Sequence, residues 1–152
     1  MDIVWLDKFS LIDFPWKACC IIFTPWCNLR CKYCHNKEFV LPKLIRNSIK
    51  NKIKEKDFFD FLDTRIWLID WVSICWWVPT LQKWLVEFCK KIKQKWFLVK
   101  LDTNWINPWV LSNLLDLKLL DYIAMDIKHD MNKYQEICQV KEANSNYLRS
   151  ID

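Results

Sequence analysis

A short apolar run followed at once by three closely spaced cysteines decides how this chain folds. Residues 18–24 read ACCIIFT, and residues 27–36 read CNLRCKYCHN. A continuous apolar run of this length predicts a strand buried on both faces, which is typical of parallel sheets. The cysteines therefore follow the carboxyl end of a predicted strand, and parallel sheets collect their active sites at that end.

The three cysteines have the spacing of a metal centre. Cys27, Cys31 and Cys34 lie on one predicted loop and can converge on one site. Thiolates hold iron–sulfur clusters, normally four for a [4Fe–4S] cluster, and three would leave one iron open, as a catalytic metal requires. The alternative is a zinc site completed by His35. That histidine adjoins Cys34, which makes it awkward for both side chains to bind one ion.

The rest of the chain alternates between predicted strands and helices. Further strands are expected at 72–75, 97–101 and 122–127, and helices at 57–66, 81–95 and 108–118. Such strand–helix units predict an α/β fold with a parallel sheet and right-handed crossovers. We recognise about four of these units in the chain.

Length and composition limit the class of protein. The 152 residues suit one domain, and 53% hydrophobic with 27% charged residues excludes a disordered or fibrous chain. No apolar run approaches the roughly 20 residues that cross a bilayer, and the first residues lack a secretory signal. We therefore expect a cytoplasmic protein with no membrane partner. In that compartment, eight cysteines indicate metal or redox chemistry rather than disulfides.

The net charge of +5 is modest, and much of it comes from a basic run between Lys43 and Lys56. Aromatic stacking residues are not interleaved with these charges, so a solvated face is favoured over a nucleic-acid surface. We expect no direct binding of nucleic acid.

The chain contains no glycine and 11 tryptophans, although about 11 glycines are expected at the usual 7%. Many tryptophans follow a proline, an aspartate, an asparagine or a basic helix end, where a turn glycine belongs: Trp16, Trp26, Trp71, Trp96, Trp105 and Trp109. We infer that tryptophan is written where the working protein carries glycine. A simple cause would be a UGA codon that is read as tryptophan although the source organism reads it as glycine. In particular, we expect positive φ at Trp16, Trp71 and Trp105. The alternative is a tryptophan-rich binding surface.

Taken together, the motifs resemble those of the radical S-adenosylmethionine (SAM) enzymes, whose hallmark is a CxxxCxxC loop after the first barrel strand. Within that superfamily the chain is similar to the activating proteins of anaerobic ribonucleoside-triphosphate reductase. The resemblance runs in order through 10–15, 23–25, 27–36, 79–82, 101–104 and 124–128. It implies a partial parallel (β/α) barrel. It also agrees with the glycine inference, because tryptophan stands at family glycines in 76–77 and 105.

The resemblance implies a definite chemistry. Cys27, Cys31 and Cys34 would hold a [4Fe–4S] cluster, and SAM would chelate the open iron. Reductive cleavage of SAM would give a 5′-deoxyadenosyl radical, which in activating enzymes takes a hydrogen from a backbone glycine of the partner. The implied partners are a glycyl radical enzyme, here anaerobic ribonucleoside-triphosphate reductase, and an electron donor such as flavodoxin or ferredoxin. Because 37–56 contains no cysteine, we expect one cluster only.

The resemblance also assigns residues to SAM. Tyr33 would lie near the adenine, and the methionine end would meet the 76–79 loop: Trp76, Trp77, Val78 and Pro79. Val78 departs from the family, which has glutamate there. Four polar residues at strand ends would face the same pocket: Asp102, Asn104, Asp126 and Lys128. A monovalent cation is implied near Asp102, Thr103 and Asp126, although the two aspartates could instead cap loops.

Two expectations concern the extent of the chain and other functions. Residues 144–151 have the makeup of a helix start, so we expect a single radical SAM domain, 1–152, that is incomplete at its C-terminus. Two other functions remain open at this point. One is another small radical SAM enzyme that acts on a small molecule, such as a deazaguanine-forming synthase; the other is a non-enzymatic zinc-binding domain.

Overall fold

A computed structural model describes residues 1–14, 16–75, 78–104 and 106–139. The strands are β1 Trp5–Ser10, β2 Cys19–Phe23, β3 Trp71–Cys75, β4 Leu98–Thr103 and β5 Tyr122–Met125. The α-helices are α1 Pro42–Ile49, α2 Glu55–Asp63, α3 Leu85–Gln94, α4 Pro108–Asp116 and α5 Tyr134–Cys138, with short 3-10 helices at 37–39, 79–81 and 131–133. Within the described ranges, the longest helix has 10 residues, and none has the length and apolar character needed to cross a membrane.

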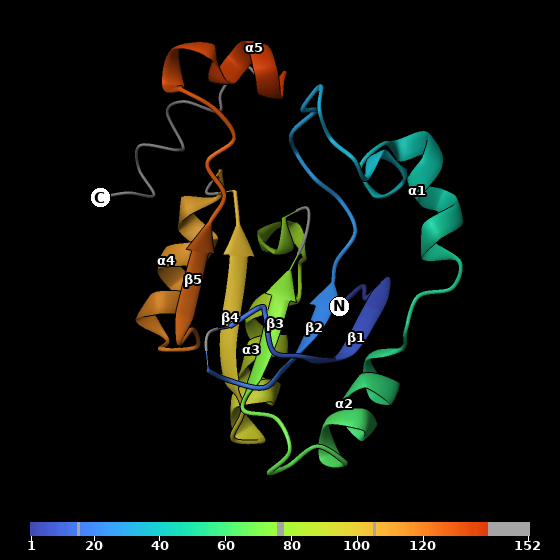
Figure 1. Ribbon diagram of the computed structural model, residues 1–152, viewed down its shortest axis with the longest axis vertical. Coiled ribbons are helices and arrows are strands. Elements are labelled where there is room, and N and C mark those ends of the chain that lie inside the picture. The colour runs from blue at the N-terminus through green and yellow to red at the C-terminus, as the bar shows by residue number, and fades with distance from the viewer. Residues whose placement is uncertain (15, 76–77, 105, 140–152) are drawn as a thin grey trace.

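The five strands form one sheet in the order β1-β2-β3-β4-β5. Strands β2 to β5 are parallel, and β1 pairs with β2 in the antiparallel sense. Figure 1 shows the arrowheads of the four parallel strands pointing toward the same end, where α5 and the loop after β2 lie. The α/β fold with its parallel sheet is confirmed. The expected helix start at 144–151 lies outside the described residues.

Three elements were not expected from the sequence: β1, α1 and α5. Most side chains of β1 are exposed, so its residues lack the apolar run that marks a buried strand. Helix α1 falls inside the basic run that was interpreted as a solvated face, and it begins with Pro42 at its first turn. Helix α5 has only five residues, which is too short for a helical period to be recognised.

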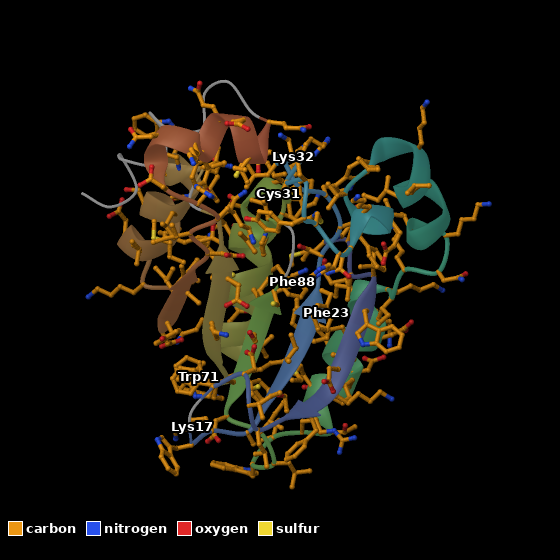
Figure 2. All side chains as sticks on the ribbon, turned by 45° about the horizontal axis from the view of Figure 1, so that its top comes forward. Lys17, Phe23, Cys31, Lys32, Trp71 and Phe88 are labelled. Atoms are coloured by element: carbon orange, nitrogen blue, oxygen red, sulfur yellow. The ribbon has the colours of Figure 1, made fainter. Side chains whose placement is uncertain are left out.

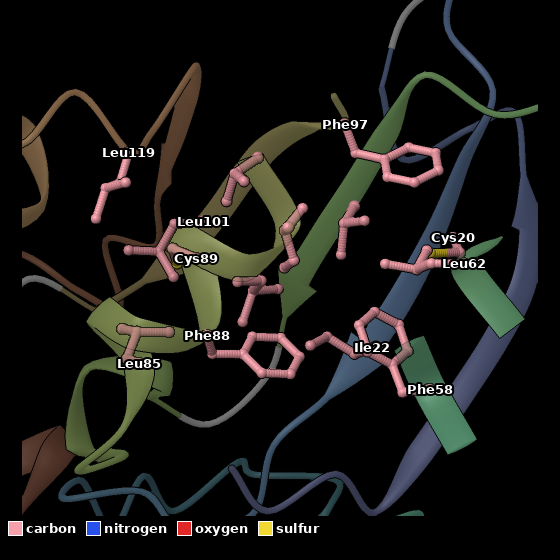
Figure 3. Close-up of a cluster of buried hydrophobic side chains, with 14 of the residues drawn as sticks. Cys20, Ile22, Phe58, Leu62, Leu85, Phe88, Cys89, Phe97, Leu101 and Leu119 are labelled. Atoms are coloured by element: carbon pink, nitrogen blue, oxygen red, sulfur yellow. The ribbon is translucent and has the colours of Figure 1, made fainter. Parts of the chain in front are cut away.

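One face of the sheet carries the main apolar core. Alternate residues of β2, β3 and β4, such as Ile22, Ile74 and Leu101, are completely buried against helices α2, α3 and α4. Figure 3 shows Phe58 of α2, Phe88 of α3 and Ile22 close together in this core. The two phenylalanine rings stack with centroids 5.4 Å apart. This placement of helices on one face is that of a partial barrel, whose other face is its interior.

The interior face is closed at its lower end by the segment before β2. Phe14 stacks on Trp71 with ring centroids 4.1 Å apart and meets the edge of Tyr122 at 5.0 Å. A smaller buried cluster there includes Cys19, Ile21 and Cys75 together with Trp71. In Figure 2, Trp71 and Lys17 lie at the end of the sheet opposite Cys31 and Lys32. This segment covers the amino ends of the parallel strands. The interior is therefore left open at their carboxyl ends.

The backbone tests the glycine inference at individual tryptophans. Trp16, Trp26, Trp67 and Trp96 have φ of 64°, 80°, 72° and 69°, in the left-handed region that favours glycine. Trp16, Trp67 and Trp96 are more than nine-tenths exposed, so their indoles contribute little packing. The expectation for Trp71 is wrong, because this residue is extended and begins β3, where its neighbours on β2 and β4 fix it in the ladder. Trp105 lies outside the described residues.

Candidate functional site

A cavity of about 530 Å³ opens at the carboxyl ends of the parallel strands. Its wall comes from four parts of the chain: the loop after β2, Cys75 at the end of β3, the end of β4, and the end of β5 with the segment that follows it. Nine of the residues that the sequence assigned to the site border it: Cys27, Cys31, Tyr33, Cys34, Asp102, Thr103, Asn104, Asp126 and Lys128. Residues nearly 100 positions apart thus meet around one space.

Val78 and Pro79 are the described residues of the expected site that the structure does not bring to this cavity. Val78 is completely buried and Pro79 is buried at the start of a 3-10 helix, and neither borders the cavity. Val78 is an apolar side chain, so burial in the core is its more favourable position. Trp76 and Trp77 lie outside the described residues.

Backbone hydrogen bonds shape the cysteine loop. The amide of Leu29 donates to Cys27 Sγ at 3.3 Å, and the amide of Cys34 donates to the carbonyl of Cys31 at 3.0 Å. The Arg30 guanidinium donates to the carbonyls of Cys27 and Leu29, each at 2.7 Å. Leu29 itself is buried and anchors the loop in a small apolar cluster. The loop therefore turns back on itself and places all three thiols beside one cavity.

A fourth cysteine lies next to this loop, although no motif in the sequence predicted it there. Cys138 on α5 is completely buried, and its Sγ lies 3.8 Å from that of Cys31. The amide of Arg30 donates to the carbonyl of Cys138 at 2.8 Å, which fixes α5 on the loop. The two cysteines are 107 positions apart, so only the tertiary fold brings them together.

Burial sets the protonation state of two thiols at the site, Cys27 and Cys138. It raises the pKa of Cys27 from 9.0 to about 11, even though a backbone hydrogen bond favours the thiolate. Burial and the neighbouring Cys31 raise the pKa of Cys138 to about 12. Both side chains are therefore protonated thiols at neutral pH, and binding of a metal at Cys27 must release a proton.

Polar contacts join the cysteine loop to the ends of β4 and β5. The buried Asn104 donates from Nδ2 to Asn28 Oδ1 at 2.8 Å. Tyr33 donates its hydroxyl to the carbonyl of Lys128 at 2.8 Å, and burial raises the pKa of Tyr33 to about 12. The amide of Asp126 donates to the carbonyl of Thr103 at 2.9 Å. These bonds join the cysteine loop, the end of β4 and the segment after β5 to one another.

A buried lysine stands on the inner wall, and the sequence analysis missed it. Lys100 is 7% exposed, and its ammonium lies 3.1 Å from Asp102 Oδ1 and 3.1 Å from Asp13 Oδ2. Burial alone would lower the pKa of Lys100, but the carboxylates of Asp102 and Asp13 outweigh it and raise that pKa. Lys100 lies two residues before Asp102 on β4, so strand alternation could have placed both on one face.

The donor set fits an iron–sulfur cluster in its chemistry. Three thiols border one cavity that also has room for a further ligand, and every cysteine of the chain is free of a disulfide. Across the ranges that the structure describes, no three metal-binding side chains stand close enough to hold one ion as they are. To hold one metal centre, the three thiols would have to turn toward a common point.

Comparison with known proteins agrees with this geometry. Residues 21–152 match the family model of the radical SAM superfamily. Two proteins of Methanocaldococcus jannaschii, MJ1227 and MJ1632, are 37% and 33% identical over 134 residues, or 88% of this chain. Both are provisionally named glycyl-radical enzyme activating enzymes. The chain spans about half the length of these relatives, 52% and 47% respectively.

The fold is also similar to a solved structure. TYW1 with a lysine-pyruvate adduct bound superposes with a TM-score of 0.55 at 19% identity, over 88% of this chain and 50% of that chain. At this identity the likeness concerns the fold alone. It agrees with the partial barrel described above.

Proposed function

Because the chain belongs to the radical SAM superfamily, we propose that it is the cluster-binding part of a glycyl-radical-enzyme activase. The observation that carries the proposal is the meeting of Cys27, Cys31 and Cys34 with the polar ends of β4 and β5 around one cavity. The names of the two relatives from M. jannaschii support the same class of activity. In this class, the bound cluster and SAM supply a carbon-centred radical that abstracts a hydrogen atom.

We assign the three loop cysteines as ligands of a single [4Fe–4S] cluster. Their thiols have the right chemistry, since iron–sulfur clusters are held by thiolates. Cys27 is a protonated thiol before binding, so a metal ligated there would displace its proton. The small apolar cluster that contains Leu29, Tyr134 and Cys138 packs behind Cys27 and Cys31 and keeps water from that side of the loop.

We assign Tyr33 of the cysteine loop and the opposite wall of the cavity to SAM. Tyr33 is about half exposed, so its ring is accessible to a planar base such as adenine. Asp102, Asn104, Asp126 and Lys128 offer carboxylates, an amide and an ammonium to the amino, carboxylate and hydroxyl groups of SAM. The hydrogen bond between Asn104 and Asn28 keeps this wall at a fixed distance from the cysteine loop.

The proposed partner is a glycyl radical enzyme, and the sequence motifs favour anaerobic ribonucleoside-triphosphate reductase. The reductant would be a small electron-transfer protein such as flavodoxin or ferredoxin. We place the protein in the cytoplasm, because eight free cysteines suit a reducing compartment.

Anaerobic reconstitution of the full-length protein with iron and sulfide tests the proposal. We expect about four irons per chain, a broad absorbance in the visible blue and reductive cleavage of SAM to methionine and 5′-deoxyadenosine. Cys31→Ala should lose the cluster and abolish cleavage. Cys89→Ala is the control, because Cys89 is also a free cysteine but is buried in α3 on the helix-covered face, whereas Cys31 is half-buried at the cavity.

Three outcomes would contradict parts of this proposal. One colourless zinc per chain in place of iron would favour the zinc-binding domain. Cleavage that survives the loss of Cys31 would refute the ligand assignment. Cleavage of SAM without formation of a glycyl radical on the co-purified reductase, detected by electron paramagnetic resonance, would favour an enzyme that acts on a small molecule.

A further inference from the structure

The inner wall of the cavity carries a buried cation of its own. Lys100 is 7% exposed, and its ammonium donates to both the carbonyl and Oδ2 of Asp13, each at 3.1 Å. On its other side it lies 3.1 Å from Asp102 Oδ1. Asp13 belongs to the segment before β2 and Asp102 to β4, so the ammonium joins two parts of the chain that are far apart in sequence.

The contact between Lys100 and Asp102 is a charge contact rather than a full hydrogen bond. Asp102 Oδ1 is buried, and the structure gives it no hydrogen-bond partner within the described residues although the ammonium is 3.1 Å away. Two opposite charges attract at any angle, so the two groups interact at this distance without a hydrogen bond. The ammonium therefore stands beside the carboxylate at the distance of an ion pair.

The second carboxylate that the resemblance assigned to a metal cation has an ammonium partner as well. Asp126 forms an ion pair with Lys128, two residues further along the chain. Unlike Lys100, this pair is at the rim, since Asp126 is an exposed residue. Both carboxylates of the implied cation site thus already have a lysine ammonium as ion-pair partner, and Lys100 divides its charge between Asp102 and Asp13.

A monovalent metal ion does not fit this arrangement. A site for such an ion needs several oxygen ligands with free negative charge. Next to Asp102 an added cation would meet the Lys100 ammonium, which is similar in size to a potassium ion and already touches the carboxylate. Like charges at this separation repel, and burial screens them little.

We propose that the Lys100 ammonium is the resident cation of this wall, and that the cavity binds SAM without a monovalent metal ion. Lys100 is then a positioning residue, because its ammonium holds the Asp102 carboxylate in an ion pair before SAM enters. The inference rests on the proposed function only in naming SAM as the ligand. The position of the Lys100 ammonium beside Asp102 does not depend on which ligand the cavity binds.

Exchange of salts tests the proposal. The full-length protein, with its cluster reconstituted, is compared in potassium chloride and in tetramethylammonium chloride at equal ionic strength. Binding of labelled SAM is measured by equilibrium dialysis, and the thermal midpoint is measured without SAM. The variants are Lys100→Met and the matched control Lys93→Met, which removes a partly exposed lysine paired with Asp121 away from the cavity.

For the wild type we expect the same SAM affinity and the same thermal midpoint in both salts. Lys100→Met should bind SAM about tenfold more weakly in tetramethylammonium, because it leaves two carboxylates without their partner. Potassium should restore part of this affinity and raise the midpoint, since it can now enter the vacated position. Lys93→Met should bind SAM like the wild type and show no preference for either salt.

Two results would overturn the proposal: tighter SAM binding by the wild type in potassium, or a Lys100→Met defect that potassium does not relieve. If Lys100→Met does not fold, thallium-205 resonance on the wild type decides instead, since saturable thallium binding that potassium displaces contradicts the proposal and its absence supports it. The thermal and thallium measurements need no SAM. A protein that fails to cleave SAM but shows these results would refute the proposed function alone.

Discussion

The two faces of the same sheet differ in what their residues do. Toward α2, α3 and α4, strands β2 to β4 present apolar side chains that are completely buried, such as Ile22, Ile74 and Leu101. Toward the interior, the same strands present thiols, a serine and the Lys100–Asp102 pair. Successive residues of a strand point to opposite faces, so one short sequence serves both.

The two faces therefore contribute to different properties: one to the stability of the fold and the other to the chemistry of the cavity. The helix-covered face gains free energy from burial of apolar surface, at about 25 cal/mol per Å². The interior face holds charges and thiols whose burial is unfavourable unless they are paired or bind a ligand. Substitutions on the first face should therefore change the free energy of unfolding, and those on the second should change binding.

Removal of a core aromatic ring should give the largest effect on stability. Phe88 is 1% exposed and stacks on Phe58, so Phe88→Ala should lower the free energy of unfolding by about 3–5 kcal/mol. Phe14→Ala is the counterpart on the interior face, where the ring is only half-buried against Trp71. Its loss should be about half as large, and urea unfolding measures both. Equal losses would remove the distinction between the two faces.

Alkaline pH should destabilise the helix-covered face through its thiols. An unfolded cysteine releases its proton near pH 9.0, whereas burial raises the pKa of Cys89 to about 12. Between these values the folded state binds more protons than the unfolded state, so stability falls as pH rises above 9. The slope should be up to about 1.4 kcal/mol per pH unit for this thiol.

Cys89→Ala should reduce the measured slope between pH 9 and 10 by its own share, while buried thiols such as Cys19, whose pKa is raised to about 11, keep theirs. Its stability at pH 7 should be somewhat lower than that of the wild type, because it leaves a small cavity in α3. An unchanged slope would show that Cys89 is not the group responsible.

A smaller effect is expected at the tryptophans with positive φ. In the chain as written, Trp96→Gly should raise the free energy of unfolding by about 1 kcal/mol, because glycine adopts φ of 69° without steric cost. Trp5→Gly is the control, since Trp5 is also exposed but lies in β1. There glycine should cost about 0.5–1 kcal/mol. The same sign at both positions would contradict the backbone argument.

A peptide mass spectrum of the protein from its own cells checks the glycine inference directly. A peptide covering residues 66–83 contains positions 67, 71, 76 and 77. We expect glycine masses at all four. Tryptophan masses there, in a protein that still cleaves SAM, would refute the inference.

Local sequence determined much of the fold and the cysteine loop. The apolar run at 18–24 predicted β2, and the CxxxCxxC spacing predicted the thiols at its end, because both patterns reside in neighbouring residues. The turn context likewise indicated glycine at Trp16, Trp26 and Trp96, where φ is positive. The positive φ that the same context predicted at Trp71 is wrong, because the sheet ladder holds this residue extended.

Only the tertiary structure decided which distant residues meet. Cys138 lies beside Cys31 across 107 positions of sequence, and Lys100 lies between Asp13 and Asp102 across 87 positions on one side. The exposed β1 became an edge strand because β2 offered it a partner, not because of its own pattern. Periodicity and spacing predict the local conformation and burial of a residue within its own element. Contacts between distant residues depend instead on how whole elements pack against one another.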